Sequence, residues 1–374
     1  MSDFPPPGPP PPPGAPPPGE PAAPPQWGPA APQQWGPAPP PQPGFGAPPP
    51  PGWTPERGML GAAHKPGAMP LRPLSLGEIY DAAFRIIRFN PKATVGSAVL
   101  VAAIAMAIPV LLVGVLTWTV GLTYDPSATE VSDEDAIGYV VAYGSYAAAA
   151  ILQGLGLILV TGMVVHVTAA AAVGKRLTLG EAWAATHGRR WRLVGLALVL
   201  ALATTLILAV YAMFVVLVVL LTPTVAAVLL IIFSVPVLAA FMSWFWIRVY
   251  YLPVPALMLE DLGVVSSIGR GYRLSLGGFW RIFGIALLTV VIGAFAGQLL
   301  GLPFSIGGTV GSLTVDEDLS LFVTILGTAL AQVATTAFVA PFTSTVTSLQ
   351  YLDQRMRKEA YDVELMRQAG VLGS

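Results

Sequence analysis

Long stretches without a charged residue are the feature that most constrains this chain. Five of them occur, at residues 93–124, 136–174, 193–247, 282–315 and 319–352. About 20 apolar residues are enough for a helix to cross the hydrocarbon core of a bilayer, so four stretches fit one span each. The stretch 193–247 is too long for one span and has a fold point at Thr222-Pro223-Thr224. We therefore predict six spans, at about residues 95–119, 145–171, 195–221, 225–247, 282–303 and 321–344.

Composition excludes several classes of protein. Only 10% of the residues are charged and 54% are hydrophobic, whereas a soluble domain carries about 25% charge. A single soluble domain is therefore excluded. The 19 Lys and Arg residues against 20 Asp and Glu residues leave no basic excess, so we expect no nucleic-acid partner. The chain has no cysteine, which excludes disulfides and thiolate metal sites.

The distribution of charge predicts the topology. With six spans, alternate connecting segments hold all nineteen basic residues, six, five, four and four in chain order. The other connections, 125–135, 222–224 and 316–318, hold no basic residue and eight acids. Lys and Arg near span ends favour the cytoplasmic side. We expect a multi-pass protein of the cell (inner) membrane with both termini in the cytoplasm.

The N-terminal tail differs sharply from the remainder. Residues 1–55 contain 26 prolines and no Val, Ile or Leu, which predicts a disordered segment of polyproline II character. The pentapeptide Gln26–Ala30 (QWGPA) recurs at Gln34–Ala38. This repeat is either low-complexity drift or a pair of aromatic docking elements for a proline-recognising groove. The predicted organisation is therefore a tail and junction at 1–73, a membrane domain at 74–348, and a C-terminal helix and tail at 349–374, with the helix on the membrane surface or against a partner.

An internal repeat divides the membrane domain. Leu74–Glu78 (LSLGE) reappears as Leu177–Glu181 (LTLGE), and each copy lies just before a predicted span. Each copy also reads as a capping box, in which a Ser or Thr hydroxyl and a Glu satisfy backbone N–H groups at the start of a helix. A third, weaker copy begins near Glu260–Gly263. The repeat predicts three units, each an interfacial amphipathic helix followed by two spans, and the fold class is all-α.

Basic residues on the interfacial segments are candidates for binding lipid head groups. They are ordinary anchors of span depth, or they contact anionic lipids at about 1 kcal/mol per cation. The candidate head-group contacts are Arg189, Arg190, Arg192, Arg270, Arg273 and Arg281.

Two further sets of residues lie inside predicted spans. Gly293, Gly297 and Gly301 form a small-residue ridge at helical spacing, which favours close helix packing, within the chain rather than between copies. His166 and Gln298 are candidate intramembrane polar residues, expected to hydrogen-bond to neighbouring helices or water. No span carries Asp, Glu, Lys or Arg at its centre, so the chain lacks the charged intramembrane residues that an ion-coupled carrier uses.

Motifs of catalysis are also missing. The sequence contains no GxxxxGK[ST] loop, HExxH helix or GxSxG elbow, and the three histidines have no partners at zinc-ligand spacing. We expect no enzyme activity and no cofactor.

Three segments carry a family resemblance: Leu74–Arg85 (LSLGEIYDAAFR), Arg270–Arg281 (RGYRLSLGGFWR) and Leu352–Leu365 (LDQRMRKEAYDVEL). They resemble the glycerophosphoryl diester phosphodiesterase membrane-domain family, and within it the actinobacterial proline- and glycine-rich transmembrane proteins. The resemblance covers about residues 72–368. Some relatives carry a fused phosphodiesterase barrel. That barrel and its His-Arg-Gly string are absent here, so the resemblance implies a membrane domain without that activity.

Two functional hypotheses follow. The first is a non-enzymatic integral membrane scaffold or accessory protein that recruits a protein partner through the proline-rich tail. The alternative is binding or transport of a lipid or small amphiphile within the membrane domain. Expected partners are membrane lipids, including anionic ones, and a protein ligand of the tail; the sequence is also compatible with an oligomer.

Overall fold

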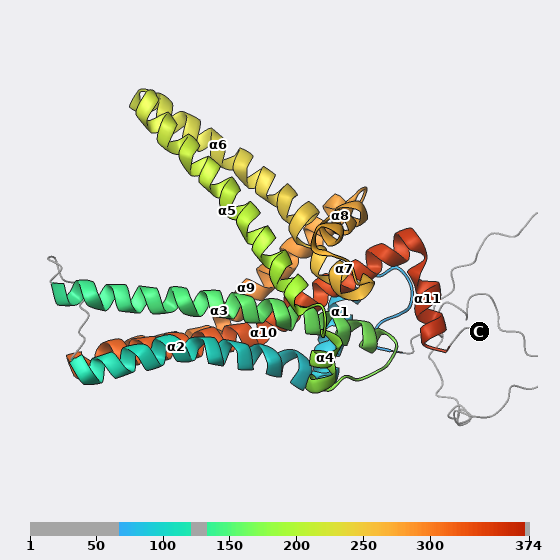
Figure 1. Ribbon diagram of the computed structural model, residues 1–374, viewed down its shortest axis with the longest axis horizontal. Helices are drawn as coiled ribbons and strands as arrows, with labels where there is room; N and C mark the ends of the chain where they lie inside the picture. The colour runs from blue at the N-terminus through green and yellow to red at the C-terminus, as the bar shows by residue number, and fades with distance from the viewer. Residues whose placement is uncertain (1–66, 121–132, 371–374) are drawn as a thin grey trace, which may run out of the picture. The chain divides into compact units, whose positions relative to one another are not determined.

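The computed structural model describes residues 67–120 and 133–370, and all regular secondary structure within these ranges is helical (Figure 1). The predicted disordered tail, and the acidic connection after the first span as far as residue 132, lie outside the described residues. The elements are α1 (Leu76–Phe89), α2 (Ser97–Val120), α3 (Asp133–Ala172), α4 (Leu179–Ala185), α5 (Arg190–Leu221), α6 (Thr224–Phe245), α7 (Pro253–Glu260), α8 (Val264–Ser275), α9 (Phe279–Ser312), α10 (Glu317–Glu359) and α11 (Tyr361–Gln368), with π-helical turns η1 (Lys92–Gly96) and η2 (Trp246–Tyr250).

The six-span prediction is confirmed. Six helical stretches are long and apolar enough to cross a membrane, and each overlaps one predicted span. The predicted fold point is also present, because α5 ends at Leu221 and α6 begins at Thr224. The stretches are Lys92–Leu116, Ala147–Ala172, Arg190–Leu221, Thr224–Glu260, Phe279–Ser312 and Leu319–Glu359.

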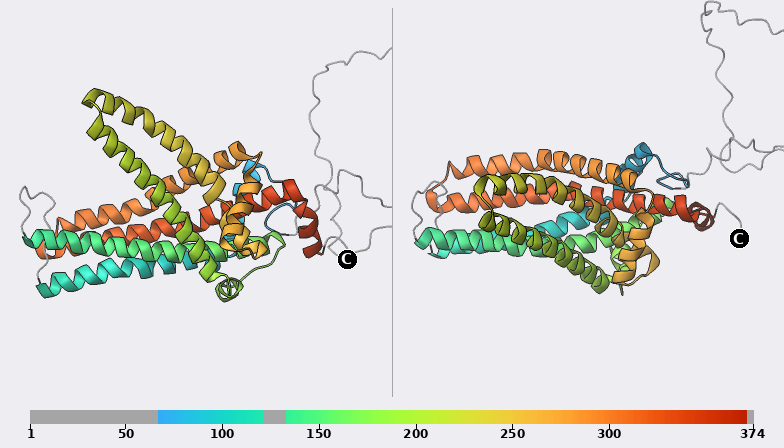
Figure 2. Two further views of the ribbon diagram at one scale, coloured as in Figure 1. Left: turned by 45° about the horizontal axis from the view of Figure 1, so that its top comes forward. Right: turned by 90° about the horizontal axis from the view of Figure 1, so that it is seen from above.

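Four of the span helices pack against one another. In both views α2, α3, α9 and α10 run side by side, with α10 in contact with the other three (Figures 1 and 2). Helices α5 and α6 form a hairpin that diverges from them (Figure 1). Three buried leucines near the start of α5, Leu193, Leu196 and Leu200, pack against Val165 of α3, whereas the described core takes only Ala227 from α6. Most of the hairpin surface is therefore exposed and apolar, as expected of helices that face lipid.

Both predicted capping boxes form. The Ser75 hydroxyl accepts from the Glu78 N–H while the Glu78 carboxylate accepts from the Ser75 N–H, and Thr178 and Glu181 repeat this arrangement. The element order also follows the predicted three units, with α1 before α2 and α3, α4 before α5 and α6, and α8 before α9 and α10. The third unit has no side-chain cap at Gly263, because glycine has no side chain to offer.

One end of the bundle carries α1, α4, α7, α8, α11 and the last turns of α10 (Figure 2). We call it the basic end, because many of the described Lys and Arg residues lie on these elements, including Arg85 and Arg88 of α1, Arg270 and Arg273 of α8, and Arg355 and Arg357 of α10. The largest apolar core lies here and joins distant parts of the chain, namely Met69, Leu71 and Leu74 before α1, Ile79 and Ile86 of α1, and Leu349, Leu352 and Met356 of α10.

The segment before α1 is packed, and the predicted boundary at residue 73 falls inside it. Met69 and Leu74 are fully buried, and the Ala68 N–H donates to the Ala171 carbonyl at 2.9 Å. A Cβ on Gly67 would lie 2.3 Å from the carbonyl oxygens of Ala171 and Ala172. The close approach of the two backbones therefore requires glycine at this position.

The expected place of the C-terminal helix needs correction. We predicted that this helix lies on a membrane surface or against a partner through an apolar stripe of Leu349, Leu352, Met356 and Val363. Instead α10 continues without a break from the sixth span to Glu359, and three stripe residues, Leu349, Leu352 and Met356, are buried in the chain's own core. Only Val363 of that stripe is exposed. Because α1 presents a matching apolar face, burial within the chain removes the stripe from water without a membrane.

Candidate functional site

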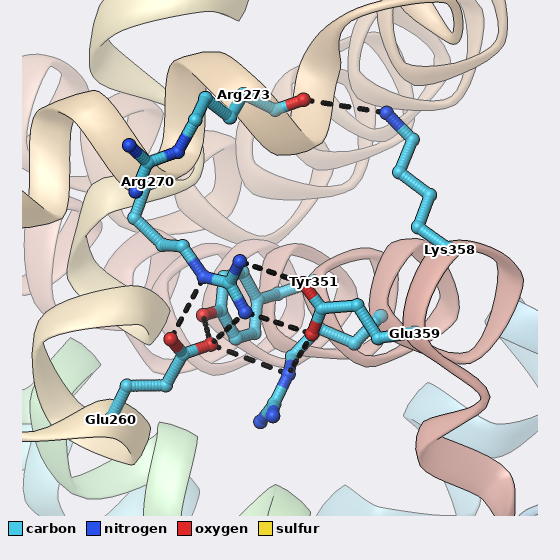
Figure 3. Close-up of polar contacts among 7 residues, drawn as sticks. Glu260, Arg270, Arg273, Tyr351, Lys358 and Glu359 are labelled. Carbon is cyan, nitrogen blue, oxygen red and sulfur yellow. Dashed lines mark hydrogen bonds and ion pairs between the residues drawn. The ribbon is translucent and has the colours of Figure 1, made fainter.

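A network of partly buried ion pairs lies at the basic end and joins α7, α8 and α10. The Arg270 guanidinium donates to both carboxylate oxygens of Glu260, at 2.8 and 3.0 Å, and pairs with both oxygens of Glu359, at 2.8 and 2.6 Å (Figure 3). These side chains are 18–29% exposed. Arginine is suited to this position because its planar fork can serve two carboxylates at once.

Two residues of α10 complete this network. The Tyr351 hydroxyl donates to Glu260 in a very short hydrogen bond (Figure 3). The Arg355 Nε lies 3.3 Å from Glu260 and 3.1 Å from Glu359, and its guanidinium stacks 3.8 Å from the Tyr361 ring. We call Glu260, Arg270, Tyr351, Arg355 and Glu359 the ionic platform. Two arginines balance two carboxylates here, which leaves no spare charge for a ligand.

A second network fixes the backbone of Leu74. The Asp353 carboxylate is 1% exposed and accepts from the Leu74 N–H at 2.8 Å. Arg281 and Arg357 both pair with Asp353, at 3.1 and 3.0 Å, and both donate to the Leu74 carbonyl. Every polar group of the Leu74 backbone is therefore bound by side chains from α9 and α10. We call these four residues the Leu74 lock.

The connection from α8 to α9 is capped by Lys358. Its Nζ donates to the Leu276 carbonyl at 2.5 Å and lies 3.4 Å from the Arg273 carbonyl, a favourable place for a cation at a helix C-terminus. The Arg273 side chain points away from the ionic platform (Figure 3). It is exposed and has no ion pair in the described part of the chain.

The remaining predicted head-group residues are engaged at the start of α5. Arg189 and Arg192 both donate to the Asp261 carboxylate, at 2.9 and 3.0 Å, and this hydrogen bonding and charge, Arg189 first, lower the pKa of Asp261. Arg190 stacks 3.8 Å from the Trp183 ring and donates to the Trp183 carbonyl. Of the six candidate arginines, five therefore have protein partners, and Arg273 alone is left exposed without one among the described residues.

The glycine ridge contacts α10. A Cβ on Gly297 would lie 2.8 Å from Thr335 and 2.9 Å from Val339, and one on Gly301 would lie 2.8 Å from the Thr335 hydroxyl. Gly293 faces Val339 and Thr343 at ordinary contact distance. The Thr335 hydroxyl donates to the Gly297 carbonyl at 2.9 Å. The ridge thus packs within the chain, as the sequence interpretation favoured.

The polar residues within the spans divide into paired and unpaired ones. Gln298 is exposed and makes no hydrogen bond to the described residues. The His166 Nε2 is buried and has no partner there either. Gln153 is among the paired ones: it is 7% exposed and donates to the Thr336 hydroxyl at 2.9 Å, with Gln332 3.5 Å away. This contact joins α3 to α10.

Sequence reasoning missed a cavity of about 460 Å³ lined by Arg85, Arg88 and Arg176. It lies between the end of α1, the segment at Gly67 and the turn after α3. The sequence did hold a sign of this basic cluster. Arg88 and Lys92 flank Asn90-Pro91, and Lys175-Arg176 precede the second capping box, with no acidic residue directly beside either pair. Arg85 pairs with Asp81, whereas Arg88 and Arg176 form no ion pair with the described residues, so a ligand could neutralise them.

Neither the chemistry nor the comparisons identify a family or an activity. Within residues 67–120 and 133–370, no three His, Asp or Glu side chains lie together as metal ligands would. Comparison of the chain with protein-family models, with curated proteins and with solved structures gives no match.

Proposed function

We propose that this chain is a non-enzymatic integral membrane scaffold or accessory protein that recruits a protein partner through its proline-rich tail. The carrying observation is the Leu74 lock. Both polar groups of the Leu74 backbone are bound by Asp353, Arg281 and Arg357, so the tail leaves the membrane domain from a fixed point. A catalytic site in the membrane domain would not require the tail to be attached at a fixed point, whereas recruitment of a partner through the tail does.

The tail has the reach that this role requires. A polyproline II segment extends about 3.1 Å per residue, so residues 1–55, in the conformation that their sequence predicts, would be about 170 Å long. The stiffness of a polyproline II segment would lower the entropy lost on docking, and the repeated Trp-Gly-Pro-Ala elements at 27–30 and 35–38 offer two aromatic contacts for a groove that recognises proline. Two elements on one stiff strand also permit bivalent binding.

The test is crosslinking in native membranes. A photoreactive amino acid replaces Gln26 or Gln34, each next to one of the two tryptophans, and proteins crosslinked to the full chain are identified. We expect one dominant partner, whose copurification is lost when residues 2–55 are deleted while membrane insertion is unchanged. Copurification of the same partner with the deleted form would refute tail-mediated recruitment. A partner crosslinked only from a control position in the membrane domain would do so too.

A cytoplasmic partner of the tail requires both termini of this six-span chain to lie in the cytoplasm. Because the chain has no cysteine, single cysteines can report its topology. Ser374→Cys should react with a membrane-impermeant maleimide only after the cells are opened, and Ser132→Cys should react in intact cells. The reverse pattern would place the tail outside and exclude a cytoplasmic partner.

The second candidate function is binding of a lipid or small amphiphile. It is favoured by the cavity that Arg85, Arg88 and Arg176 line, and it does not depend on the tail.

A further inference from the structure

We propose that an anionic phospholipid binds in a continuous groove at the basic end, with its phosphate among Arg88, Lys92 and Arg176 and an acyl chain between α2 and α3. This inference stands apart from the tail-dependent function. It concerns residues that sequence reasoning did not single out.

Three adjoining hollows form the groove. The first is the cavity of about 460 Å³ lined by Arg85, Arg88 and Arg176. The second, of about 640 Å³, shares Phe89 and Arg176 with the first and adds Lys92. The third, of about 450 Å³, shares Leu100 and Leu179 with the second. The shared residues place the three hollows next to one another in a row.

Polarity changes along the groove as it does along a phospholipid. The first hollow is lined by arginines, whereas the third is lined by apolar side chains of two span helices, including Val101 and Ile104 of α2 and Leu159 and Val160 of α3. These residues belong to the spans Lys92–Leu116 and Ala147–Ala172, and Leu179, Gly180 and Trp183 of α4 complete the lining. A ligand that fills all three hollows must therefore be charged at one end and apolar at the other.

The charged end of the groove, which we call its mouth, holds basic residues without acidic partners. Arg88, Lys92 and Arg176 are exposed and form no ion pair in the described part of the chain. The acids on the flanking helices are already engaged: Asp81 pairs with Arg85 at 2.9 Å, Glu78 pairs with Arg72, and Glu181 closes its capping box. The mouth is therefore a site of net positive charge beside an apolar slot, which selects an anionic head group.

The walls of the mouth are held in place before any ligand arrives. The Arg176 guanidinium stacks 4.0 Å from the Phe89 ring. Asn90 is 4% exposed and its side-chain oxygen accepts from the Leu177 N–H at 3.2 Å, which ties the end of α1 to the turn after α3. Such preorganisation lowers the ordering cost of binding.

The chain's own tail is a poorer occupant. The residues that lead to Gly67 include Arg57 and Lys65, with Glu56 the only acid among residues 56–66. Like charges would meet at the mouth. Deletion of residues 2–66 should therefore leave lipid binding unchanged, and tighter binding after that deletion would overturn the choice of a lipid as the natural occupant.

The decisive measurement is native mass spectrometry of the full chain in detergent, titrated with phosphatidylglycerol or with phosphatidylcholine of the same acyl chains. We expect preferential retention of phosphatidylglycerol. The double variant Arg88→Gln with Arg176→Gln should bind phosphatidylglycerol about 30-fold more weakly, since each cation near a membrane surface supports a several-fold gain, and should bind phosphatidylcholine as before. The matched control, Arg273→Gln with Arg367→Gln, removes two exposed cations outside the groove and should match the wild type.

A second pair of variants tests the apolar half without altering charge. Leu100→Trp fills the point where the second and third hollows meet and should weaken phosphatidylglycerol binding, while Leu111→Trp, exposed on the same helix outside the groove, should not. Retention unchanged by Leu100→Trp, or displacement of the lipid by millimolar inorganic phosphate, would overturn the proposal, the latter because it indicates a site for free phosphate. If the Gln variant does not fold, the Lys variant at both positions keeps the charge and should keep the preference; loss of preference there, in a folded protein, would also count against it.

Discussion

The carboxylate of Asp353 accepts the backbone N–H of Leu74 across 279 positions of sequence, and it is almost completely buried where it does so. The last turns of α10 therefore bind the segment at which the membrane domain begins. Arg281 and Arg357 supply the balancing charge and bind the Leu74 carbonyl. The attachment joins the first and last described units of the fold through one carboxyl group.

Asp353→Asn should release this attachment. The amide keeps the size of the side chain but leaves Arg281 and Arg357 without their carboxylate, and loss of one partner of a buried ion pair costs on the order of 3 kcal/mol. We expect earlier thermal unfolding in lipid nanodiscs and faster proteolysis near residues 67–75. Asp362→Asn is the control, since Asp362 has no ion pair among the described residues. Equal stability of the two variants would show that the Leu74 lock is not needed for the fold.

The ionic platform depends on the shape of arginine. Arg270→Lys keeps the charge, but an ammonium cannot serve Glu260 and Glu359 through four contacts at once. We expect a loss of about 2 kcal/mol of local stability and about 30-fold faster amide exchange in α8. Arg273→Lys on the same helix should leave exchange unchanged, because the Arg273 side chain is exposed and points away (Figure 3). Similar exchange in both variants would contradict a specific role for the fork.

Local patterns predicted most of the fold, because their causes are local. The spans follow from stretches that lack charge, and the capping boxes follow from hydrogen bonds between residues three apart. The pairing of the arginines could not be predicted in the same way. Glu359 meets Arg270 across 89 positions and Asp261 meets Arg189 across 72, and only the packing of helices brings these residues together.

The polar residues of the spans show what helical periodicity could have added. Once Gly297 is assigned to the face that contacts α10, the next residue, Gln298, lies about 100° further around the helix and must face elsewhere. That inference was within reach of the sequence. The partner of Gln153 was not, because the register of α3 against α10 is set by the packing of both whole helices.

The Gln153 contact should stabilise the bundle modestly. Gln153→Leu removes the hydrogen bond to Thr336, and such contacts within membranes average about 0.6 kcal/mol, with a maximum of about 1.7. We expect a small drop in the unfolding temperature in nanodiscs. Gln298→Leu, on an exposed face, should cause no drop. A larger loss from Gln298→Leu would indicate a polar partner for that residue outside the chain.

The Asp261 contact should weaken in acid. Arg189 lowers the pKa of Asp261 below its ordinary value, which is about 3.9. A lowered folded-state pKa contributes stability that is fully present above the ordinary value and is lost as the pH falls through the folded value. The stability difference between the wild type and Asp261→Asn should therefore be larger at pH 7 than at pH 3. A stability difference for Asp261→Asn that is the same at pH 7 and pH 3 would contradict the pairing.

Gly297 of α9 packs closely against two side chains of α10. A Val side chain there would begin with a Cβ within 3 Å of both Thr335 and Val339, and overpacking of this kind costs about 1–3 kcal/mol. We expect Gly297→Val to lower the unfolding temperature while the oligomeric state, measured by mass in detergent, is unchanged. Gly284→Val is the matched control on the same helix, because a Cβ at Gly284 meets nothing within 4 Å. A change in oligomeric state caused by Gly297→Val at unchanged stability would instead place the ridge between two copies of the chain.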